Sequence, residues 1–162
     1  MTTTTQTRFR LHAIAPESLQ QVRTTGLDVS GQPVEHVDGE GLPLRRCLRN
    51  STAGEKLMLF GYEPALPPSP YREIGAVYAH AEPCQGPDHT DRYPSDWHGR
   101  PQVFRAYDDR GWIHHQATRV HDGTNPEQQI VEIFAHPEVT QIHTRNVAAG
   151  CYMLRITRPD RG

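Results

Sequence analysis

Three side chains that can carry out chemistry lie at alternate positions in one short run, His80-Ala81-Glu82-Pro83-Cys84. Alternate residues of a β-strand point to one face, so an imidazole, a carboxylate and a thiol would project together. Such a trio could bind a metal ion or form a nucleophile–base pair. We therefore take His80, Glu82 and Cys84 as candidate catalytic residues. The plainer alternative is a strand end that enters a polar loop, with Cys84 as a small buried hydrophobic residue.

No known metal or cofactor motif accompanies this run. It differs from the zinc deaminase signature because Gly86-Pro87 stands where a second cysteine is needed. The ten histidines are scattered and show no H-x-x-x-H or H-E-x-x-H spacing. A metal site would need distant residues, for example His80 with His143. The sequence thus implies no cofactor and predicts no metal ligands, although a metal-dependent enzyme with scattered His, Glu and Cys ligands remains an alternative.

A fourth candidate catalytic residue is Cys151, which follows Gly150 at the start of an expected strand. His143 lies eight residues earlier, so a cysteine–histidine pair across a hairpin is one hypothesis and core packing of the thiol is the other. Three cysteines is an odd count, and the N-terminal residues do not resemble a signal peptide. We therefore expect reduced thiols in a cytoplasmic protein.

Arginine and tyrosine recur together at expected strand ends and turns. Guanidinium and phenol groups that converge are suited to binding a small carboxylate or phosphate. In the other interpretation, the arginines pair with Glu73, Asp108 or backbone carbonyls and hold the turns in place. The candidate ligand-binding residues are Tyr71, Arg72, Arg105, Tyr107, Arg145 and Asn146.

Composition limits the classes of protein and partner. A chain of 162 residues is long enough to bury a core as one domain. Its net charge of -2 argues against a nucleic-acid partner, and no apolar run approaches the roughly 18 residues of a membrane span. A small anionic ligand is the partner that the arginines favour. An exposed edge strand would also leave a homodimer open.

Pattern and turn signals predict many short strands and two short helices. The helices are expected at residues 16–24, ended by Gly26, and after a capping box at residues 124–127. The hairpin-like connections predict an α+β fold with a mostly antiparallel sheet, rolled or barrel-like. We expect polar tails at residues 1–7 and 159–162 around a single domain at 8–158. The expected strands are 8–12, 34–37, 45–48, 57–62, 74–80, 101–108, 111–120, 139–145 and 151–157.

Two irregular segments are expected beside the candidate residues. Four prolines in residues 64–70 exclude a helix or a central strand there, so this segment should run as an extended arm. Residues 85–101 form a long polar loop, which is uncommon inside a compact domain unless it is functional or mobile. A pocket bounded by residues 64–84, 85–101 and 145–152 is the predicted site.

Several separated motifs stand in order along the chain: GEKLMLFGY (54–62), SPYREIG (69–75), RAYD (105–108) and RNVAAGCY (145–152). They resemble the DUF1203 family, a bacterial family of unknown function. The resemblance runs from about Phe9 to Arg158 and departs at Ile74-Gly75-Ala76-Val77, where a Gly-Pro pair and an aromatic residue would be expected. It implies the extent of a domain and little chemistry.

Three hypotheses for function follow, and whether the protein is an enzyme is left open. In the first, Arg72, Arg105 and Arg145 orient a small anionic metabolite, and His80, Glu82 or a cysteine supplies acid–base or nucleophilic chemistry. The second is a non-catalytic module that binds a small ligand or another protein. The third is the metal-dependent enzyme.

Overall fold

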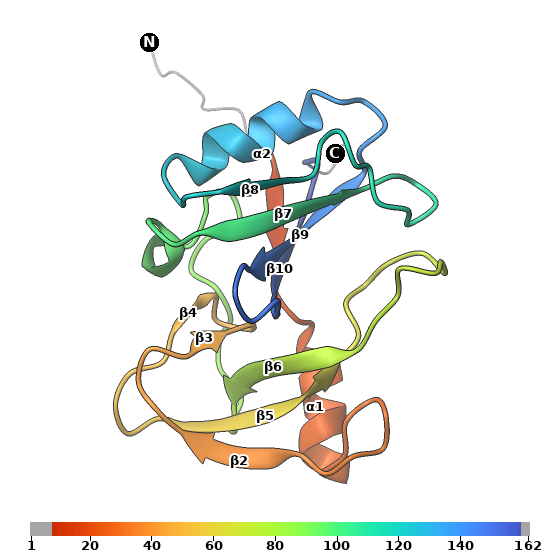
Figure 1. The fold of residues 1–162 in the computed structure, drawn as a ribbon. Helices are drawn as coiled ribbons and strands as arrows, with labels where there is room; N and C mark the ends of the chain where they lie inside the picture. The colour runs from red at the N-terminus through yellow and green to blue at the C-terminus, as the bar shows by residue number, and fades with distance from the viewer. Residues whose placement is uncertain (1–7, 160–162) are drawn as a thin grey trace.

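Within residues 8–159, which a computed structural model describes, ten strands form two five-stranded sheets (Figure 1). The predicted tail at residues 1–7 and residues 160–162 lie outside this range. The predicted α+β class with two short helices and mainly antiparallel strands is confirmed. The sheets stay open rather than closing into a barrel.

The first sheet has the order β1-β10-β9-β7-β8, and all of its pairs are antiparallel. Helix α2 (Pro126–Phe134) covers one of its faces, and its buried side chains join the larger hydrophobic core (Figure 1). The strands are β1 (Arg10–His12), β7 (Gln102–Tyr107), β8 (Arg119–His121), β9 (Gln141–Asn146) and β10 (Tyr152–Thr157).

The second sheet has the order β2-β5-β6-β3-β4, in which β3 and β6 run parallel. Helix α1 (Pro16–Thr25) packs beside it, and Leu19 and Val22 of this helix enter a second core with Tyr152 of the first sheet. The strands are β2 (Glu35–Asp38), β3 (Pro43–Leu44), β4 (Arg49–Asn50), β5 (Lys56–Tyr62) and β6 (Gly75–His80).

Two local predictions were wrong, and one strand is shorter than predicted. Residues 45–48 form the turn between β3 and β4 rather than a strand, and β5 pairs with β2 and β6. The predicted strands at 101–108 and 111–120 do pair antiparallel across a turn at 108–111, but only β8 and a single bridge at Ile113 of the second strand pair with β7. The capping box at 124–127 is not formed, because Thr124 bonds to Asp122 and the N-cap is Asn125, which has a left-handed backbone.

A buried arginine connects the two sheets. The side chain of Arg45 donates from Nε to the carbonyl of Tyr152 in β10 at 2.7 Å, while its backbone N–H donates to Tyr78 in β6. Desolvation lowers the pKa of Arg45 to about 10, so the guanidinium remains charged. Because a buried cation must be hydrogen-bonded, this residue fixes the turn at 45–48 against both sheets.

The described residues contain no helix long and apolar enough to cross a membrane.

His143 is buried where the two cores meet. Its ring lies 4.7 Å from Tyr107 and 5.4 Å from Tyr152, centre to centre, and its Nε2 donates to the carbonyl of Ala65 at 3.2 Å. Burial lowers the pKa of His143 to about 3. The folded protein therefore holds a neutral imidazole at neutral pH.

We predict that His143 makes the protein acid-sensitive. Its folded pKa lies below its unfolded value of about 6.5, so the stability it contributes is present above that pH and lost as the pH falls toward 3. The expected slope is at most ~1.4 kcal/mol per pH unit. Urea unfolding at pH 7 and pH 5 should show a smaller loss in His143→Gln than in the wild type. The exposed His115 provides the control variant, His115→Gln. Equal losses in wild type and His143→Gln would contradict the assignment.

Candidate functional site

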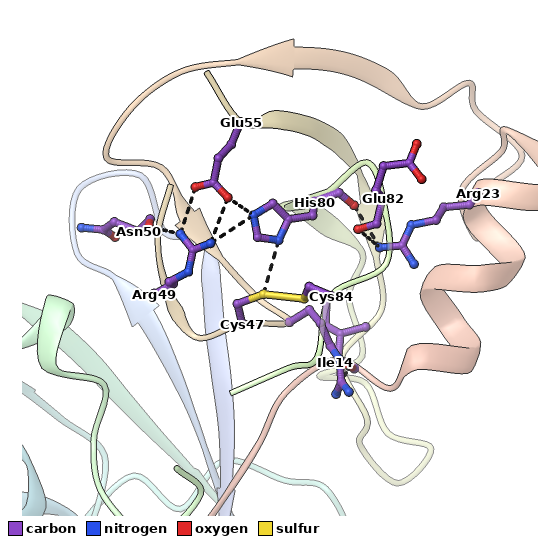
Figure 2. The surroundings of a disulfide bond; sticks show 10 residues. Ile14, Arg23, Cys47, Arg49, Asn50, Glu55, His80, Glu82 and Cys84 are labelled. Carbon is purple, nitrogen blue, oxygen red and sulfur yellow. Dashed lines mark hydrogen bonds and ion pairs between the residues drawn. A yellow bond between two sulfur atoms is a disulfide. The ribbon is translucent and has the colours of Figure 1, made fainter. Parts of the chain in front are cut away.

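A disulfide between Cys47 and Cys84 joins segments 37 residues apart in the sequence (Figure 2). The expectation of reduced thiols was therefore wrong for this pair, and Cys151 is the free cysteine of the described residues. His80 lies against the disulfide, with Nδ1 3.3 Å from Sγ of Cys47. Two sulfur atoms and an imidazole in contact make this the most chemically capable cluster among the described residues.

Cys47 lies in the tight turn that connects β3 to β4. The turn closes through a hydrogen bond from the N–H of Leu48 to the carbonyl of Leu44 at 2.9 Å. Leu48 has a left-handed backbone with φ of 54°, which costs a residue with a Cβ roughly 1–2 kcal/mol. The buried side chain of Leu48 in the larger core offsets this cost. Together with Arg45, this turn holds Cys47 beside β6.

His80 is the last residue of β6, and Arg23 of α1 fixes the chain that follows it. The Arg23 guanidinium donates to the carbonyls of His80, Ala81 and Glu82 at 3.0, 3.1 and 3.2 Å (Figure 2). These bonds satisfy carbonyls that have left the sheet, and the chain turns so that Cys84 reaches Cys47.

Glu55 holds the other side of the His80 ring. Its carboxylate accepts two hydrogen bonds from Arg49, both at 2.9 Å, and two from Thr52, and it contacts Nε2 of His80. The hydrogen bonds from Arg49, followed by those from Thr52 and His80, hold the pKa of Glu55 well below its usual range. Glu55 is therefore an ionised acceptor.

This carboxylate decides which nitrogen of His80 carries the proton. An ionised carboxylate only accepts hydrogen bonds, so Nε2 of His80 must be the donor. Arg49, whose Nη2 is 3.4 Å from Nε2, has no acceptor to offer. In the neutral ring, the lone pair of Nδ1 consequently faces Cys47. A lone pair in that position can accept a proton from a thiol or bind a metal ion.

The disulfide opens onto a cavity of about 490 Å³. Both cysteines line it, together with Arg49 and the segment that follows Cys84. This volume is within the range of small-molecule sites in proteins. The other lining residues are Leu48, Gln85, Gly86, Pro87, Asp88, His89, Arg92, Tyr93, Pro94 and Ser95.

The structure brings together only two of the three residues in the His80–Cys84 run. Because β6 ends at His80, Glu82 has no strand to place it on the same face. Its exposed carboxylate points away from the disulfide (Figure 2) and lines a separate cavity of about 830 Å³ beside Arg23 and Lys56. The predicted catalytic roles of these residues remain predictions.

Cys151 and His143 do not form the hypothesised pair across the hairpin. His143 pairs in register with Arg155, and its ring nitrogen bonds to Ala65. Cys151 is half-buried and contacts the carbonyl of Ala149 at 3.9 Å. His143 therefore cannot act as the base in the catalytic role predicted for Cys151.

The predicted arginine–tyrosine residues do gather, around Glu73. The carboxylate of Glu73 pairs with Arg105 at 3.1 Å and with Arg145. A cavity of about 10 Å³ lies between Tyr71, Tyr107 and Arg145, and a second one of about 250 Å³ is lined by Glu73, Arg145 and Cys151. The sixth residue, Asn146, accepts from Gln102 on the neighbouring strand at 3.3 Å. Internal pairing, the alternative interpretation, thus describes these contacts.

Among the described residues, two groups have metal-ligand spacing. In the first, the ligand atoms of Cys47, His80 and Cys84 all lie within 4.8 Å of one another. The second group is His114, His136 and Glu138. There, Nδ1 of His114 accepts from the N–H of Ala117, and its Nε2 lies 3.7 Å from a carboxylate oxygen of Glu138. One ring nitrogen of His114 is therefore already occupied by a backbone N–H.

Sequence reasoning missed three members of the site, Cys47, Arg49 and Glu55. They lie 25 to 33 residues before His80, and no spacing connects the two segments. One local signal was present: Thr52 and Glu55 have capping-type spacing in a turn, which marks Glu55 as an acceptor of local N–H and O–H groups.

Comparison with known proteins agrees with the motif resemblance. The model of the family described as "Protein of unknown function (DUF1203)" matches residues 41–158. The chain belongs to this family. No curated protein and no solved structure matches it. The DUF1203 match includes Cys47, Glu55, His80 and Cys84, so the whole disulfide cluster lies inside the family domain.

We predict that Glu55 stabilises the site more than an exposed ion pair would. Glu55→Gln should lower the free energy of unfolding by roughly 1–3 kcal/mol, because Arg49, Thr52 and His80 lose a charged acceptor. The control is Glu63→Gln, whose partner Arg72 is half exposed at the surface, with an expected loss below about 1 kcal/mol. Urea unfolding of the oxidised protein measures both. Losses of equal size would contradict a special role for Glu55.

Proposed function

We propose that the Cys47–Cys84 pair carries out reversible thiol–disulfide exchange with a thiol bound in the adjacent cavity. One observation carries this proposal: both cysteines line a cavity of about 490 Å³, and the Nδ1 atom of His80 lies 3.3 Å from the sulfur of Cys47. Exchange needs an accessible disulfide and a group that manages the proton of the attacking thiol, and this site has both.

The two sulfur atoms have different roles in the exchange. A substrate thiol attacks Sγ of Cys84, the Cys47–Cys84 bond breaks, and its electron pair leaves on Sγ of Cys47. The proton of the attacking thiol passes to the Cys47–His80 pair. A second thiol then attacks the substrate–Cys84 bond, which releases an oxidised disulfide and leaves both cysteines reduced. The reverse sequence reduces a substrate disulfide to two thiols and re-forms the Cys47–Cys84 bond.

Glu55 and Arg49 act as positioning residues in this scheme. Glu55 keeps the proton of His80 on Nε2, so Nδ1 stays directed at Cys47 with its lone pair free. Arg49 holds Glu55 in place through two hydrogen bonds. The arrangement follows the general order of nucleophile, base and orienting carboxylate.

The disulfide cluster supports a function better than the arginine–tyrosine cluster does. A pocket for a small anionic metabolite needs unpaired cations, whereas Arg105 and Arg145 both pair with Glu73, beside cavities of about 10 and 250 Å³ that are smaller than the cavity at the disulfide. We also propose a cytoplasmic location. In that compartment, disulfides are usually transient and catalytic or redox-sensing, which agrees with exchange at a cavity.

We predict that His80 accelerates reduction of the native disulfide. In a Cys151→Ser background, a small thiol should reduce Cys47–Cys84 at least ~10²-fold more slowly in His80→Gln than with His80 present, because the proton acceptor is gone. Mass spectrometry of acid-quenched, alkylated samples gives the rates. His114→Gln is the control and should react at the parent rate. If His80→Gln also reacts at that rate, the proposed mechanism fails.

A trapping experiment tests which sulfur is attacked. In Cys47→Ser, Cys84 should accumulate a mixed disulfide with an added small disulfide, because no partner thiol remains to displace it. In Cys84→Ser, the adduct on Cys47 should form but exchange faster with added thiol, since His80 assists the departure of Cys47. The opposite order would reverse the roles of the two cysteines.

A further inference from the structure

We infer that the reduced form of the same site binds a zinc ion through Cys47, Cys84 and His80. This inference rests on the proposed function in one respect: the disulfide must be reducible. A metal ion binds thiolates, so the disulfide and the zinc site exclude each other. The site would thus alternate between an oxidised disulfide and a reduced metal centre.

The three ligand atoms lie close enough together to be brought onto one ion once the disulfide is reduced. Zinc lies about 2.3 Å from thiolate sulfur and about 2.0–2.1 Å from imidazole nitrogen, which places ligands of one ion roughly 3.5–3.8 Å apart. The three ligand atoms here lie within 4.8 Å of one another, and Nδ1 of His80 is 3.3 Å from the sulfur of Cys47. The Cα atoms of the two cysteines are 7.1 Å apart, so the backbone leaves space between the reduced side chains. Rotation of the side chains is enough to admit the ion.

The proton arrangement of His80 is the one that metal-bound histidines use. A ligating histidine usually donates its other ring N–H to a carboxylate, which fixes the tautomer and orients the ring. Here Nε2 of His80 contacts Glu55, and Arg49 and Thr52 hold that carboxylate. The nitrogen that faces the sulfurs is therefore the one with the free lone pair. A histidine that only packed beside a disulfide would not need a carboxylate held in place to fix its tautomer.

The donor set selects the ion. Two thiolates and one imidazole suit zinc and are poor ligands for magnesium or calcium, which prefer oxygen. Three protein ligands leave the fourth tetrahedral position open, as in catalytic zinc sites. Both cysteine ligands line the 490 Å³ cavity, so that position is accessible to water or to a substrate thiolate from the same cavity. Zinc would then hold the reduced pair as thiolates and protect it from reoxidation.

Zinc titration of the reduced protein tests the inference. Protein reduced with a phosphine and desalted without oxygen should take up one zinc per chain in competition with a chromophoric chelator, while the oxidised protein should take up none. His80→Gln should weaken binding at least ~10-fold, and Glu55→Gln by ~10–100-fold. His114→Gln and Cys151→Ser are the controls and should bind like the wild type. Cobalt substitution adds a direct readout: its sulfur charge-transfer absorption should fall by half in Cys84→Ser.

Each outcome decides one proposal separately. Equal zinc uptake by oxidised and reduced protein, or unchanged affinity in His80→Gln and Cys84→Ser, would overturn the zinc site. Thiol exchange dependent on His80 would survive that result, because it is measured without metal. Conversely, if small thiols fail to reduce the native disulfide, the exchange function falls, while phosphine-reduced protein still reports on zinc. If Cys84→Ser does not fold, as circular dichroism would show, His80→Gln with intact cysteines still decides the matter.

Discussion

The carboxylate of Glu55 is the contact on which the geometry of the site depends. It is the point where three segments meet: the strand β4 through Arg49, the turn before β5 through Thr52, and the end of β6 through His80. Because Arg49 holds the pKa of Glu55 well below its usual range, this carboxylate accepts from Nε2 of His80, and a neutral ring then turns the lone pair of Nδ1 toward the sulfurs. One ionised oxygen thus sets both the position and the proton arrangement of the ring.

Arg45 makes the equivalent connection on the side of Cys47. A charged side chain would not be buried between two sheets unless its donors were satisfied, and here they reach carbonyls of Tyr152 and Pro43. The turn with Cys47 therefore cannot move independently of β6, which brings His80. Arg23 does the same for the chain that leads to Cys84. The two cysteines thus stand in irregular segments, and each of these segments is connected to the sheets by an arginine that donates to backbone carbonyls.

The sequence predicted those features of the fold that depend on local pattern. The helix at residues 16–24 has its proline start and glycine end, and the long strands β5, β6, β7, β9 and β10 carry enough alternating apolar residues to be found. Prediction failed where pairing is decided by distant partners. Residues 45–48 have the composition of a strand. They form a turn instead, because Arg45 bonds to the second sheet and Leu48 packs in the larger core. The capping box failed for a local reason, since Asp122 bonds Thr124 first.

The candidate site shows the same division more sharply. Two of its residues, His80 and Cys84, could be found because they stand in one short run. The alternation rule also placed Glu82 on a shared strand face, which does not exist because the strand ends at His80. The other half of the site, Cys47 and Glu55, comes from a segment with no spacing relation to the first. Local sequence pattern does not identify the disulfide partner of a cysteine, and the expectation of reduced thiols predicted no disulfide at all. The arginine–tyrosine cluster illustrates the opposite error: its members do converge, but Arg105 and Arg145 already pair with Glu73. Converging charged groups indicate a binding site only where some of them are unpaired and where space remains beside them. In the described part of this chain, the cavity beside the disulfide provides space, and both Cys47 and Cys84 line it.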